Sequence, residues 1–439
     1  MSWYSPADVH CVAVIARNAT LRAMEVEPWL PRAARRRPQA RALGTLTYAE
    51  LDERVRRAAG ALDAQPGERV AIALPAGREF AVALHACLIS GAVAVPVDLR
   101  LPDPPLADAT KMVDAPLGDG APIRPRPHDL GAPAVVAHTS GTTAAPRPVE
   151  LTFGNWLWSA LGSGAALGTE PADAWLCTLP LSHVGGLSIL LRSAIYGTAA
   201  DVHERWDTER ALAAITGGAT LVSVVPTTLA RLLDAGLNDP PRLRCALVGG
   251  GPCPPALLER ARGAGVPVAQ TYGLTEACSQ VTTARPGDAA PDAGPALFCT
   301  RVSIEDGEIC VRSPTVAPQA GSVLRTGDLG VLDADGRLTV TGRRSDTIVT
   351  GGENVSPTEV EAVLEAHPAV AEALVEGRPD AQWGESVAAR VVLRAGAEAA
   401  EADLREFCAS RLAAFKVPKA IELVAKLPRT ASGKLLRLK

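Results

Sequence analysis

The sequence predicts an α/β protein with a large N-terminal domain of parallel α/β sheets, a small β subdomain, and a small α+β domain at the C-terminus. Three observations carry this prediction. Segments of strand length alternate with segments of helix length between about residues 69 and 272, as in βαβ units. Short strands separated by turn signals such as Asp306-Gly307 follow near residue 285. At 439 residues the chain also exceeds the length that one hydrophobic core usually serves.

The N-terminal part begins before this alternation does. Residues 1–26 show no clear pattern, and two helices are expected between Trp29 and Ala61, with Thr47 as an N-cap. The segment Pro102–Pro133 is rich in Pro, Asp and Gly, and we expect a loop there. The alternation starts with a strand at Arg69–Leu74, a helix at Glu79–Ser90 closed by Gly91, and a strand at Val93–Val97.

The alternation resumes after this loop and brings several loops to one edge of a sheet. Ligands of such sheets bind beyond the carboxyl ends of the strands. The expected strands are Trp175–Leu179, Ala219–Val225, Leu243–Val248 and Val266–Tyr272, and the expected helices are Gly185–Ala194, one from Pro226, and Pro255–Arg262. The loops expected at the ligand edge are Thr139–Thr143, Leu181–Gly186, Gly249–Pro252 and Gly273–Glu276.

A final α+β segment follows Arg344. Ser356 is expected to be the N-cap of a helix, with Pro357 in its first turn and Glu359 completing a capping box. The buried face of that helix is expected to consist of Val360, Val363 and Leu364. We place a domain boundary near Ser345, which divides the chain into residues 1–344 and 345–439.

Composition excludes several classes of protein. No apolar run reaches the 18 or so residues of a membrane span, and no signal peptide is expected at the N-terminus. A net charge of −4 argues against a nucleic-acid surface, so the basic cluster at residues 32–37 is interpreted as a solvated helix face. The nine cysteines form no CxxC pair, and reduced thiols in a cytoplasmic protein are expected.

The most informative stretch for function is residues 135–149, where an apolar run ends in hydroxyls and glycine. The hydroxyls of Thr139, Ser140, Thr142 and Thr143, together with the backbone around Gly141, can surround a phosphate. The stretch lacks the Gly-Lys-Ser/Thr of a Walker A loop. Without further context such a cluster is more often a plain turn between two strands.

Two carboxylates follow in positions suited to nucleotide chemistry. Thr275 and Glu276 come after a strand, and a hydroxyl beside a carboxylate suits a Mg²⁺–phosphate complex. An acidic residue that stabilises a helix N-terminus is the alternative. Asp328, after Gly327, can accept hydrogen bonds from vicinal hydroxyls such as those of a ribose, or it can form an Asx turn.

Other motifs leave a functional and a structural interpretation open. His183 can line a substrate pocket or be a satisfied loop histidine. Arg343 and Ser345 lie at the domain boundary, where a hinge would be expected. The pair Gly351-Gly352 permits close approach of a narrow ligand. Lys434 is one of only six lysines, five of which fall in the last 24 residues, and it is either a solvated tail residue or a retained functional cation.

Taken together and in this order, the motifs resemble those of the adenylate-forming superfamily of acyl-CoA synthetases, luciferases and nonribosomal-peptide adenylation domains. The resemblance runs from about Trp29 to Lys434. Within the superfamily, three segments look most like the o-succinylbenzoate–CoA ligase subfamily of menaquinone biosynthesis. They are Leu179–Ser188, Tyr272–Gln280 and Arg343–Asn354.

This resemblance implies a ligase that uses ATP, Mg²⁺ and CoA and that has a mobile C-terminal domain. It implies that an acid is first activated to an acyl-adenylate and then transferred to the thiol of CoA. The implied catalytic residues are Lys434, Thr275, Glu276 (also the Mg²⁺ ligand) and His183, and Ser345 is the implied hinge. The implied nucleotide and CoA contacts are Thr139, Ser140, Gly141, Thr142, Thr143, Arg147, Gly249, Gly250, Gly251, Gln270, Thr271, Tyr272, Gly273, Asp328, Arg343, Gly351 and Gly352.

The acid substrate is less well specified. If the acid substrate carries a second carboxylate, a cation is expected in its pocket, and Arg192 is the candidate. The alternative role of Arg192 is a surface salt bridge. Ser188 and Ser279 can supply neutral donors beside His183. Other readings are another aryl- or acyl-CoA ligase, a stand-alone adenylation enzyme, and a degenerate nucleotide-binding module. The superfamily often forms dimers, so a homodimer is compatible with the resemblance.

The phosphate loop departs from the superfamily pattern. Ala144 stands where glycine is usual, and Arg147 stands where lysine is usual. Arg147 keeps the positive charge, whereas Ala144 loses backbone freedom. We therefore expect activity with an altered affinity for ATP.

Overall fold

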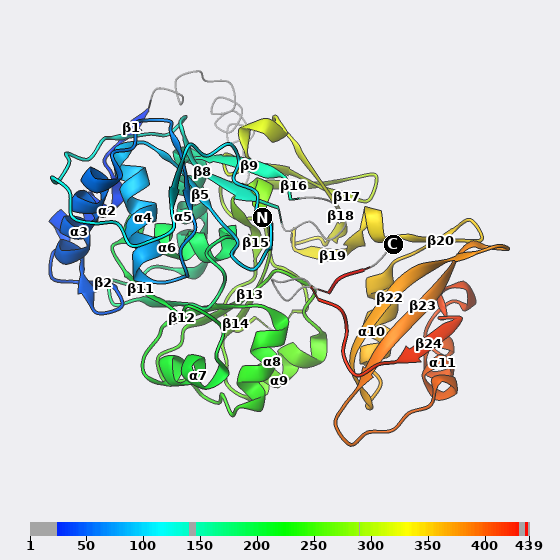
Figure 1. Cartoon of the computed structure of the whole chain (residues 1–439). Helices are drawn as coiled ribbons and strands as arrows, with labels where there is room; N and C mark the ends of the chain where they lie inside the picture. The colour runs from blue at the N-terminus through cyan, green and yellow to red at the C-terminus, as the bar shows by residue number, and fades with distance from the viewer. Residues whose placement is uncertain (1–23, 140–145, 289, 430–434, 438–439) are drawn as a thin grey trace, which may run out of the picture.

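The computed structural model describes residues 24–139, 146–288, 290–429 and 435–437. The described chain forms a large N-terminal part built on two sheets, a small antiparallel sheet beside it, and a separate α+β unit at the C-terminus (Figure 1). This is the α/β fold class that the sequence predicts. No helix of the described residues is long and apolar enough to cross a membrane.

The first sheet of the N-terminal part has five strands in the order β6-β4-β5-β8-β9. The four strands from β6 to β8 are parallel, and β9 is antiparallel to β8. Its strands are β6 (Lys111–Val113), β4 (Arg69–Ile72), β5 (Val93–Pro96), β8 (Pro133–His138) and β9 (Pro148–Thr152). The expectation that residues 102–133 form only a loop was wrong, because β6 pairs with β4 and β7 (His128–Asp129) pairs with β1 (Glu25–Val26).

The second sheet has eight strands in the order β15-β14-β13-β12-β10-β11-β2-β3. Its strands from β14 to β2 are parallel, and the outer strands β15 and β3 are antiparallel to their neighbours. Both large sheets are therefore mixed rather than purely parallel. The strands are β15 (Ser279–Thr283), β14 (Val268–Leu274), β13 (Cys245–Val248), β12 (Leu221–Val224), β10 (Ala174–Cys177), β11 (Ala199–Val202), β2 (Arg41–Leu43) and β3 (Leu46–Thr47).

One hydrophobic core joins the two sheets through helices α2 to α6, and a second lies under α7 to α9. Helix α3 begins as expected, because Thr47 Oγ1 accepts from the backbone of Glu50 and the Glu50 carboxylate accepts from the backbone of Thr47. The helices are α2 (Trp29–Arg36), α3 (Tyr48–Leu62), α4 (Arg78–Ser90), α5 (Phe153–Leu167), α6 (Val184–Tyr196), α7 (Thr208–Thr216), α8 (Pro226–Asp234) and α9 (Pro255–Gly263).

The basic cluster at residues 32–37 lies on and just after α2 and is partly tied to the protein rather than simply solvated. Arg37 donates to the backbone oxygens of Pro171 and Gly197 at 2.9 and 2.6 Å. Arg32 donates to the backbone oxygen of Ile195 at 3.4 Å. These contacts fix α2 against the end of α6.

The predicted β subdomain is a four-stranded antiparallel sheet, β16-β17-β18-β19. Its hairpins turn at Asp306-Gly307 and around Gly336, where the backbone has positive φ. The strands are β16 (Arg301–Glu305), β17 (Glu308–Arg312), β18 (Leu324–Leu332) and β19 (Leu338–Arg343). Short 3₁₀ turns lie at η2 (Thr275–Ala277), η3 (Pro318–Ala320) and η4 (Arg344–Asp346).

The C-terminal unit has its own sheet and its own hydrophobic core. Val360 and Leu364 of α10 are buried in that core and Val363 is partly buried, as expected. The sheet runs β21 (Glu353–Val355), β20 (Ile348–Thr350), β23 (Gly384–Leu393), β22 (Val370–Asp380), with β24 (Ala420–Leu423) beside β23, and the helices are α10 (Pro357–Glu365), α11 (Glu401–Ala409) and the 3₁₀ turn η5 (Ala414–Lys416).

The capping box expected at Ser356 was wrong. Ser356 is the N-cap residue, but its hydroxyl and that of Thr358 bond to the backbone oxygen of Thr341 on β19. The carboxylate of Glu359 accepts from Lys416 Nζ at 2.7 and 2.8 Å instead of closing the box. The side chains of Ser356 and Glu359 therefore bond to residues distant in the sequence rather than to each other's backbone. The contacts with Thr341 attach α10 to the end of β19.

Candidate active site

The loops after parallel strands of both large sheets meet at one region. In the first sheet, β5 leads into a turn that carries Asp98 and Arg100. In the second sheet, β10 leads to His183, the N-cap residue of α6. Nη2 of Arg100 lies 3.0 Å from Nε2 of His183, so the two loops touch. The loops after β13 and β14 share this edge, because these strands run parallel to β10 in the same sheet.

The predicted phosphate loop connects β8 to β9 in an antiparallel hairpin. The backbone N–H of Thr139 donates to the backbone oxygen of Arg147 at 3.0 Å. The backbone N–H of Arg147 donates to Thr139 Oγ1 at 3.1 Å. These two contacts close the base of the loop. Ser140, Gly141, Thr142, Thr143 and the departure at Ala144 lie outside the described residues.

Thr275 and Glu276 lie in η2, directly after β14. This turn packs against β9, and the backbone oxygen of Glu276 accepts from Ala317 at 2.8 Å. The pair therefore lies beside the strand that leaves the phosphate loop. Within the part of the chain that the structure describes, no group of three or more His, Cys, Asp or Glu side chains is arranged to hold a metal. One carboxylate beside a hydroxyl suits Mg²⁺ that is bound mainly by phosphate oxygens and water.

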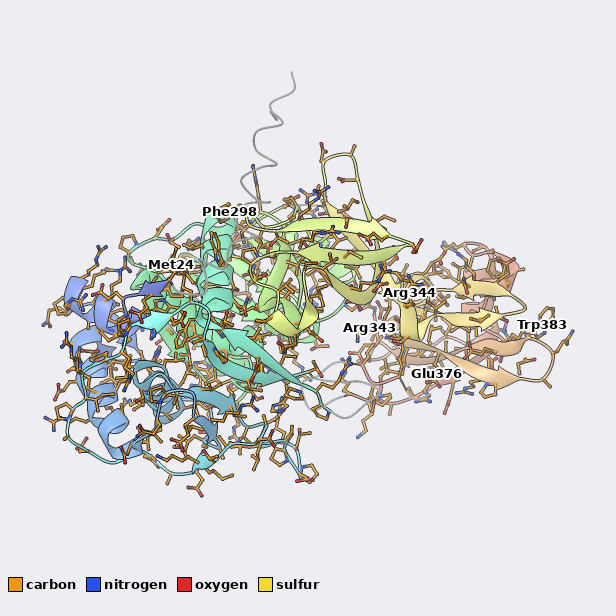
Figure 2. The ribbon with its side chains drawn as sticks, turned by 90° about the horizontal axis from the view of Figure 1, so that it is seen from above. Met24, Phe298, Arg343, Arg344, Glu376 and Trp383 are labelled. Atoms are coloured by element: carbon orange, nitrogen blue, oxygen red, sulfur yellow. The ribbon has the colours of Figure 1, made fainter. Side chains whose placement is uncertain are left out.

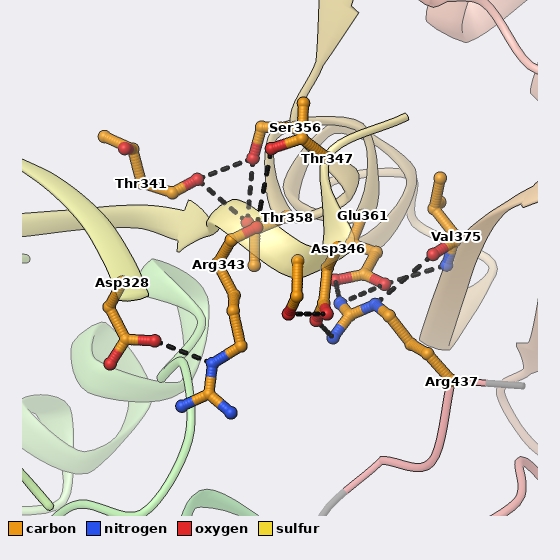
Figure 3. A network of polar contacts seen from close by, with 11 residues as sticks. Asp328, Thr341, Arg343, Asp346, Thr347, Ser356, Thr358, Glu361, Val375 and Arg437 are labelled. Atoms are coloured by element: carbon orange, nitrogen blue, oxygen red, sulfur yellow. Dashed lines mark hydrogen bonds and ion pairs between the residues drawn. The ribbon is translucent and has the colours of Figure 1, made fainter. Parts of the chain in front are cut away.

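Asp328 is buried between two strands and holds two polar partners. Its Oδ2 accepts from the hydroxyl of Tyr272 at 2.8 Å. Its Oδ1 accepts from Nε of Arg343 at 2.7 Å, as Figure 3 shows. Burial raises the pKa of Tyr272, and the Asp328 carboxylate raises it further. Burial lowers the pKa of Arg343, but the hydrogen bond to Asp328 and the negative charges of Asp328 and Asp346 together outweigh it, and the net shift is upward. Tyr272 thus stays neutral, and Arg343 stays charged, at the edge of the predicted ribose site.

The residues predicted to frame the adenine are held by backbone contacts. The side-chain amide of Gln270 donates to the backbone oxygens of Ala290 and Asp292 at 3.3 and 3.0 Å. A Cβ on Gly249 would lie 2.8 Å from Cγ2 of Thr271, and a Cβ on Gly273 would lie 1.8 Å from the backbone oxygen of Ser279. The close packing of β14 against its neighbours therefore requires glycine at both positions. Gly250 has a φ of +80°, and Gly250 and Gly251 are exposed.

The structure places Arg192 beneath an unusual turn. Arg192 is only 2% exposed, and its Nη2 donates to Ser159 Oγ at 3.1 Å. Ser159 Oγ in turn donates to the backbone oxygen of Cys278 at 2.7 Å. Cys278 and Ser279 both have positive φ, at 52° and 95°, which is costly for residues with a side chain. Arg192 and Ser159 thus support a strained turn directly after η2.

The alternative role of Arg192 in a surface salt bridge was wrong, because the guanidinium is buried. It lies 5.7 Å from the centre of the Trp175 ring, and its Nε has no hydrogen-bond partner among the described residues. Burial lowers the pKa of Arg192. A buried cation with an unpaired donor is costly unless an anion or water compensates it. Ser188, one helical turn away on α6, is also buried and donates to the backbone oxygen of Gly185 at 2.9 Å.

The predicted hinge lies at the junction of the two parts of the chain, whereas the turn that carries Gly351 lies beside Trp383. Ser345 lies in η4, and its hydroxyl donates to Asp346 Oδ1 at 2.8 Å. Figure 2 shows Arg343 and Arg344 at this junction and Trp383 at the tip of the β22–β23 hairpin. Gly351 and Gly352 have φ of +59° and +86°, and the backbone N–H of Gly351 donates to the backbone oxygen of Trp383.

Lys434 lies outside the described residues, but the chain on both sides of it is anchored. Arg429 and Leu435 form an isolated antiparallel bridge. Arg437 bonds to Glu361 on α10 and lies 3.4 Å from Asp346 in η4 (Figure 3). The described residues on both sides of Lys434 are therefore attached to the C-terminal unit, and Arg437 reaches the turn that contains Ser345.

Sequence reasoning missed four residues of this region: Asp98, Arg100, Ser159 and the hydroxyl of Tyr272 as a partner of Asp328. Asp98 and Arg100 had a usable signal, since a charged pair directly follows a buried strand of the parallel sheet. Ser159 had none, because a serine inside a helix gives no indication of the backbone turn that it will meet.

Family models match most of the chain. The model described as AMP-binding enzyme matches residues 30–117 and 103–319, and the AMP-binding enzyme C-terminal domain matches residues 359–434. Among curated proteins, a 2-succinylbenzoate–CoA ligase of Bacillus subtilis (strain 168) is 38% identical over 469 aligned positions. That alignment covers 93% of this chain and 96% of the relative.

Solved structures of the o-succinylbenzoate CoA synthetase from Bacillus subtilis are similar over the same extent. The complex with its acyl-adenylate intermediate has a TM-score of 0.87 at 36% identity, and covers 94% of this chain and 98% of that one. The complex with ATP and magnesium ion also has a TM-score of 0.87 at 36% identity, with 94% and 99% covered. A double variant bound to a product analogue has a TM-score of 0.69 at 36% identity, with 94% and 98% covered.

Proposed function

The chain belongs to the AMP-binding enzyme family, and we propose that it is an o-succinylbenzoate–CoA ligase, an AMP-forming acid–thiol ligase of menaquinone biosynthesis. The observation that carries this proposal is the similarity to 2-succinylbenzoate–CoA ligases along almost the whole length of both chains. The substrates are o-succinylbenzoate, ATP and CoA, with Mg²⁺ as the metal ion.

The reaction has two steps. In the first, a carboxylate oxygen of the acid attacks the α-phosphorus of ATP, which forms the acyl-adenylate and releases pyrophosphate. In the second, the thiol of CoA attacks the acyl carbon, which forms the thioester and releases AMP. Both steps build up negative charge near phosphate, so fixed cations and hydrogen-bond donors supply most of the catalysis.

We assign the nucleotide to the loops described above. The phosphate loop from Thr139 to Thr143, with Arg147 at its base, takes the β- and γ-phosphates. Thr275 contacts phosphate, and Glu276 holds Mg²⁺, which neutralises phosphate charge when bound. Asp328 accepts from the ribose hydroxyls with its remaining lone pairs, while Arg343 both orients Asp328 and reaches the nucleotide. The adenine lies between Gly249–Gly251 and Gln270–Gly273.

The acid site is assigned to the edge where α6 begins. His183 and Ser279 present polar groups there, and Ser188 and Arg192 lie deeper along α6. Arg192 supports the Cys278–Ser279 turn through Ser159, and its Nε, which has no partner among the described residues, can donate to an anion that reaches it. This arrangement fits an acid with a second carboxylate.

The two steps need two arrangements of the C-terminal domain. We divide the chain into an adenylation domain, residues 1–344, and a lid domain, residues 345–439, with Ser345 as hinge. Lys434 serves the first step, and rotation at Ser345 brings Gly351-Gly352 to the CoA thiol for the second. The higher TM-score with the acyl-adenylate complex than with the product-analogue complex supports such a rotation. A cytoplasmic location and a homodimer complete the proposal.

The proposal is tested by CoA-dependent AMP release with o-succinylbenzoate, benzoate, salicylate, succinate and a medium-chain fatty acid. Strong preference for o-succinylbenzoate is expected. Preference for another acid would keep the two-step chemistry and reject the substrate. ATP binding without AMP release on any acid would reject the enzyme assignment in favour of a nucleotide-binding module.

A further inference from the structure

The turn after β5 holds a charged pair that is locked by its own hydrogen bonds. Oδ1 of Asp98 accepts from the backbone N–H and from Nε of Arg100, at 3.1 and 2.7 Å. Oδ2 of Asp98 accepts from Nη2 of Arg100 at 2.6 Å. The backbone oxygen of Asp98 accepts from Leu101, which closes the turn. Two side chains that are only two residues apart are thus fixed as one rigid unit.

The same guanidinium reaches His183 on the other sheet. Nη2 of Arg100 lies 3.0 Å from Nε2 of His183, while Oδ2 of Asp98 lies 3.8 Å from that nitrogen. The first distance is a hydrogen bond and the second is too long to be one. His183 is also fixed by its backbone, because its N–H donates to Pro180 and its carbonyl accepts from Gly186 and Leu187 at the start of α6.

The direction of the Arg100–His183 hydrogen bond follows from the donor inventory of the two groups. A guanidinium has only donors, so the histidine nitrogen must be the acceptor. An accepting Nε2 has no proton, and a neutral imidazole then carries its proton on Nδ1. A carboxylate in the place of Arg100 would favour the opposite tautomer or a charged ring. The imidazole can be protonated on Nδ1 only, on Nε2 only, or on both nitrogens, and the hydrogen bond from Arg100 favours the first of these states.

Asp98 keeps the Arg100 guanidinium within hydrogen-bond distance of Nε2 of His183. Its side chain is 15% exposed and that of Arg100 is 33% exposed. Burial alone would raise the pKa of Asp98, but the hydrogen bonds and the positive charge of Arg100, together with His183, outweigh it and lower the pKa below the ordinary value. The carboxylate is thus charged and keeps the guanidinium beside His183 at neutral pH.

We propose that Asp98 and Arg100 are positioning residues for the acid site, which hold His183 as a neutral imidazole with its proton on Nδ1. His183 then serves as a hydrogen-bond donor to the acid rather than as a cation or a general base. This role at the acid site rests on the proposed function, whereas the tautomer is a property of the protein alone.

Nitrogen NMR of protein labelled with ¹⁵N-histidine tests the tautomer. The chain has seven histidines, and the His183 signals are assigned by their loss in His183→Gln. In the wild type we expect a pyridine-type shift for Nε2 and a pyrrole-type shift for Nδ1 of His183. In Arg100→Gln we expect the two shifts to move toward each other or to exchange. A proton on Nε2 in the wild type, or unchanged shifts in Arg100→Gln, would overturn the proposal.

Steady-state kinetics test the role at the acid site. Loss of one positioned donor bond predicts that Arg100→Gln raises KM for the acid about tenfold, with KM for ATP within about twofold of the wild type. Arg100→Lys, which keeps a cationic donor, is expected to restore part of the loss. Asp98→Asn is expected to shift KM for the acid in the same direction as Arg100→Gln.

The matched control is Arg41→Gln. Arg41 forms a somewhat more exposed pair with Asp201 near the β3 edge of the eight-stranded sheet, at 2.9 and 2.8 Å. Neither the His183 shifts nor KM should change in this variant. Equal rises of KM for the acid and for ATP in Arg100→Gln would indicate a general structural role and reject the proposal. If no acid is turned over at all, the proposed function fails while the NMR result still decides the tautomer.

Discussion

Arg437, the last residue that the structure describes, donates from Nη2 to both carboxylate oxygens of Glu361, at 2.8 and 2.7 Å. Glu361 lies on α10 and is only 6% exposed. Burial raises the pKa of Glu361, and Arg437 opposes that shift. Arg437, three residues beyond Lys434, is thus attached to the C-terminal unit through a buried charge.

We expect Arg437→Met to destabilise the lid domain. Removal of one partner leaves a buried carboxylate without its cation, which costs about 3–5 kcal/mol. Limited proteolysis should show faster cleavage within residues 345–439, and thermal unfolding should begin at a lower temperature. The control is Arg405→Met, which breaks an exposed i,i+4 pair with Glu401 that contributes about 0.5 kcal/mol. Equal sensitivity of the two variants would show that the Glu361 contact is not stabilising.

Asp328→Asn should weaken ATP binding. The change removes the charge that Arg343 and Tyr272 surround, and the amide presents a donor to one of those groups. Loss of a charge-assisted bond costs about 1.5–3 kcal/mol, so KM for ATP should rise roughly 10- to 100-fold, with a smaller change for the acid. Isothermal titration with ATP gives the affinity directly. An unchanged affinity would remove Asp328 from the nucleotide site.

Lys434→Ala should separate the two steps of the reaction. A fixed cation at the developing charge of the first step is worth about 10²- to 10³-fold in rate. Pyrophosphate exchange should therefore fall by that factor. Thioester formation from supplied acyl-adenylate and CoA should stay close to the wild-type rate. Equal loss of both activities would contradict the assignment of Lys434 to adenylation.

Gly351→Ala should slow thioester formation more than Gly352→Ala does. Both positions have positive φ, where a side chain costs roughly 1–2 kcal/mol. At Gly351 the added Cβ would also collide with Trp383, 2.7 Å from Cε3, whereas at Gly352 no atom of the described residues lies within 4 Å. The rate from supplied acyl-adenylate measures the second step alone. Similar rates in the two variants would mean that the Trp383 contact does not constrain the loop.

Buried histidines should make the large domain sensitive to acid. Burial lowers the pKa of His85 to about 4, below the ordinary value of 6.5. Between pH 6.5 and pH 4 the unfolded chain therefore binds a proton on His85 that the folded chain does not bind. The contribution of His85 to the free energy of unfolding is fully present above pH 6.5 and decreases as the pH falls toward 4. His128, whose pKa burial lowers to about 3, acts in the same direction.

The test compares urea unfolding of the wild type and His85→Leu at pH 7.5 and pH 5. At pH 5 the wild type should lose about 2 kcal/mol more than the variant does. The comparison cancels groups that titrate in both proteins, such as Glu365, whose pKa burial raises to about 7. Parallel losses in the two proteins would show that His85 is not the cause.

The limits of prediction from the sequence are clearest at two helix starts. Thr47 is the N-cap that the sequence predicts, and it also forms a capping box with Glu50, because both partners lie within one turn of the same helix. The same motif at Ser356 and Glu359 fails, since the carbonyl of Thr341 and the ammonium of Lys416 compete for the side chains. Local motifs are therefore reliable only where no distant group competes.

The sequence by itself determined the alternation of strands and helices in the large domain and the set of motifs that identify the family. These depend on neighbouring residues or on the period of the pattern, so the chain displays them directly. Only the tertiary structure decided that Arg192 is buried beneath the Cys278–Ser279 turn and that Arg100 meets His183. Those contacts join residues 33 or more positions apart, or on different sheets, and no local pattern encodes which distant groups the packing of two sheets will bring together.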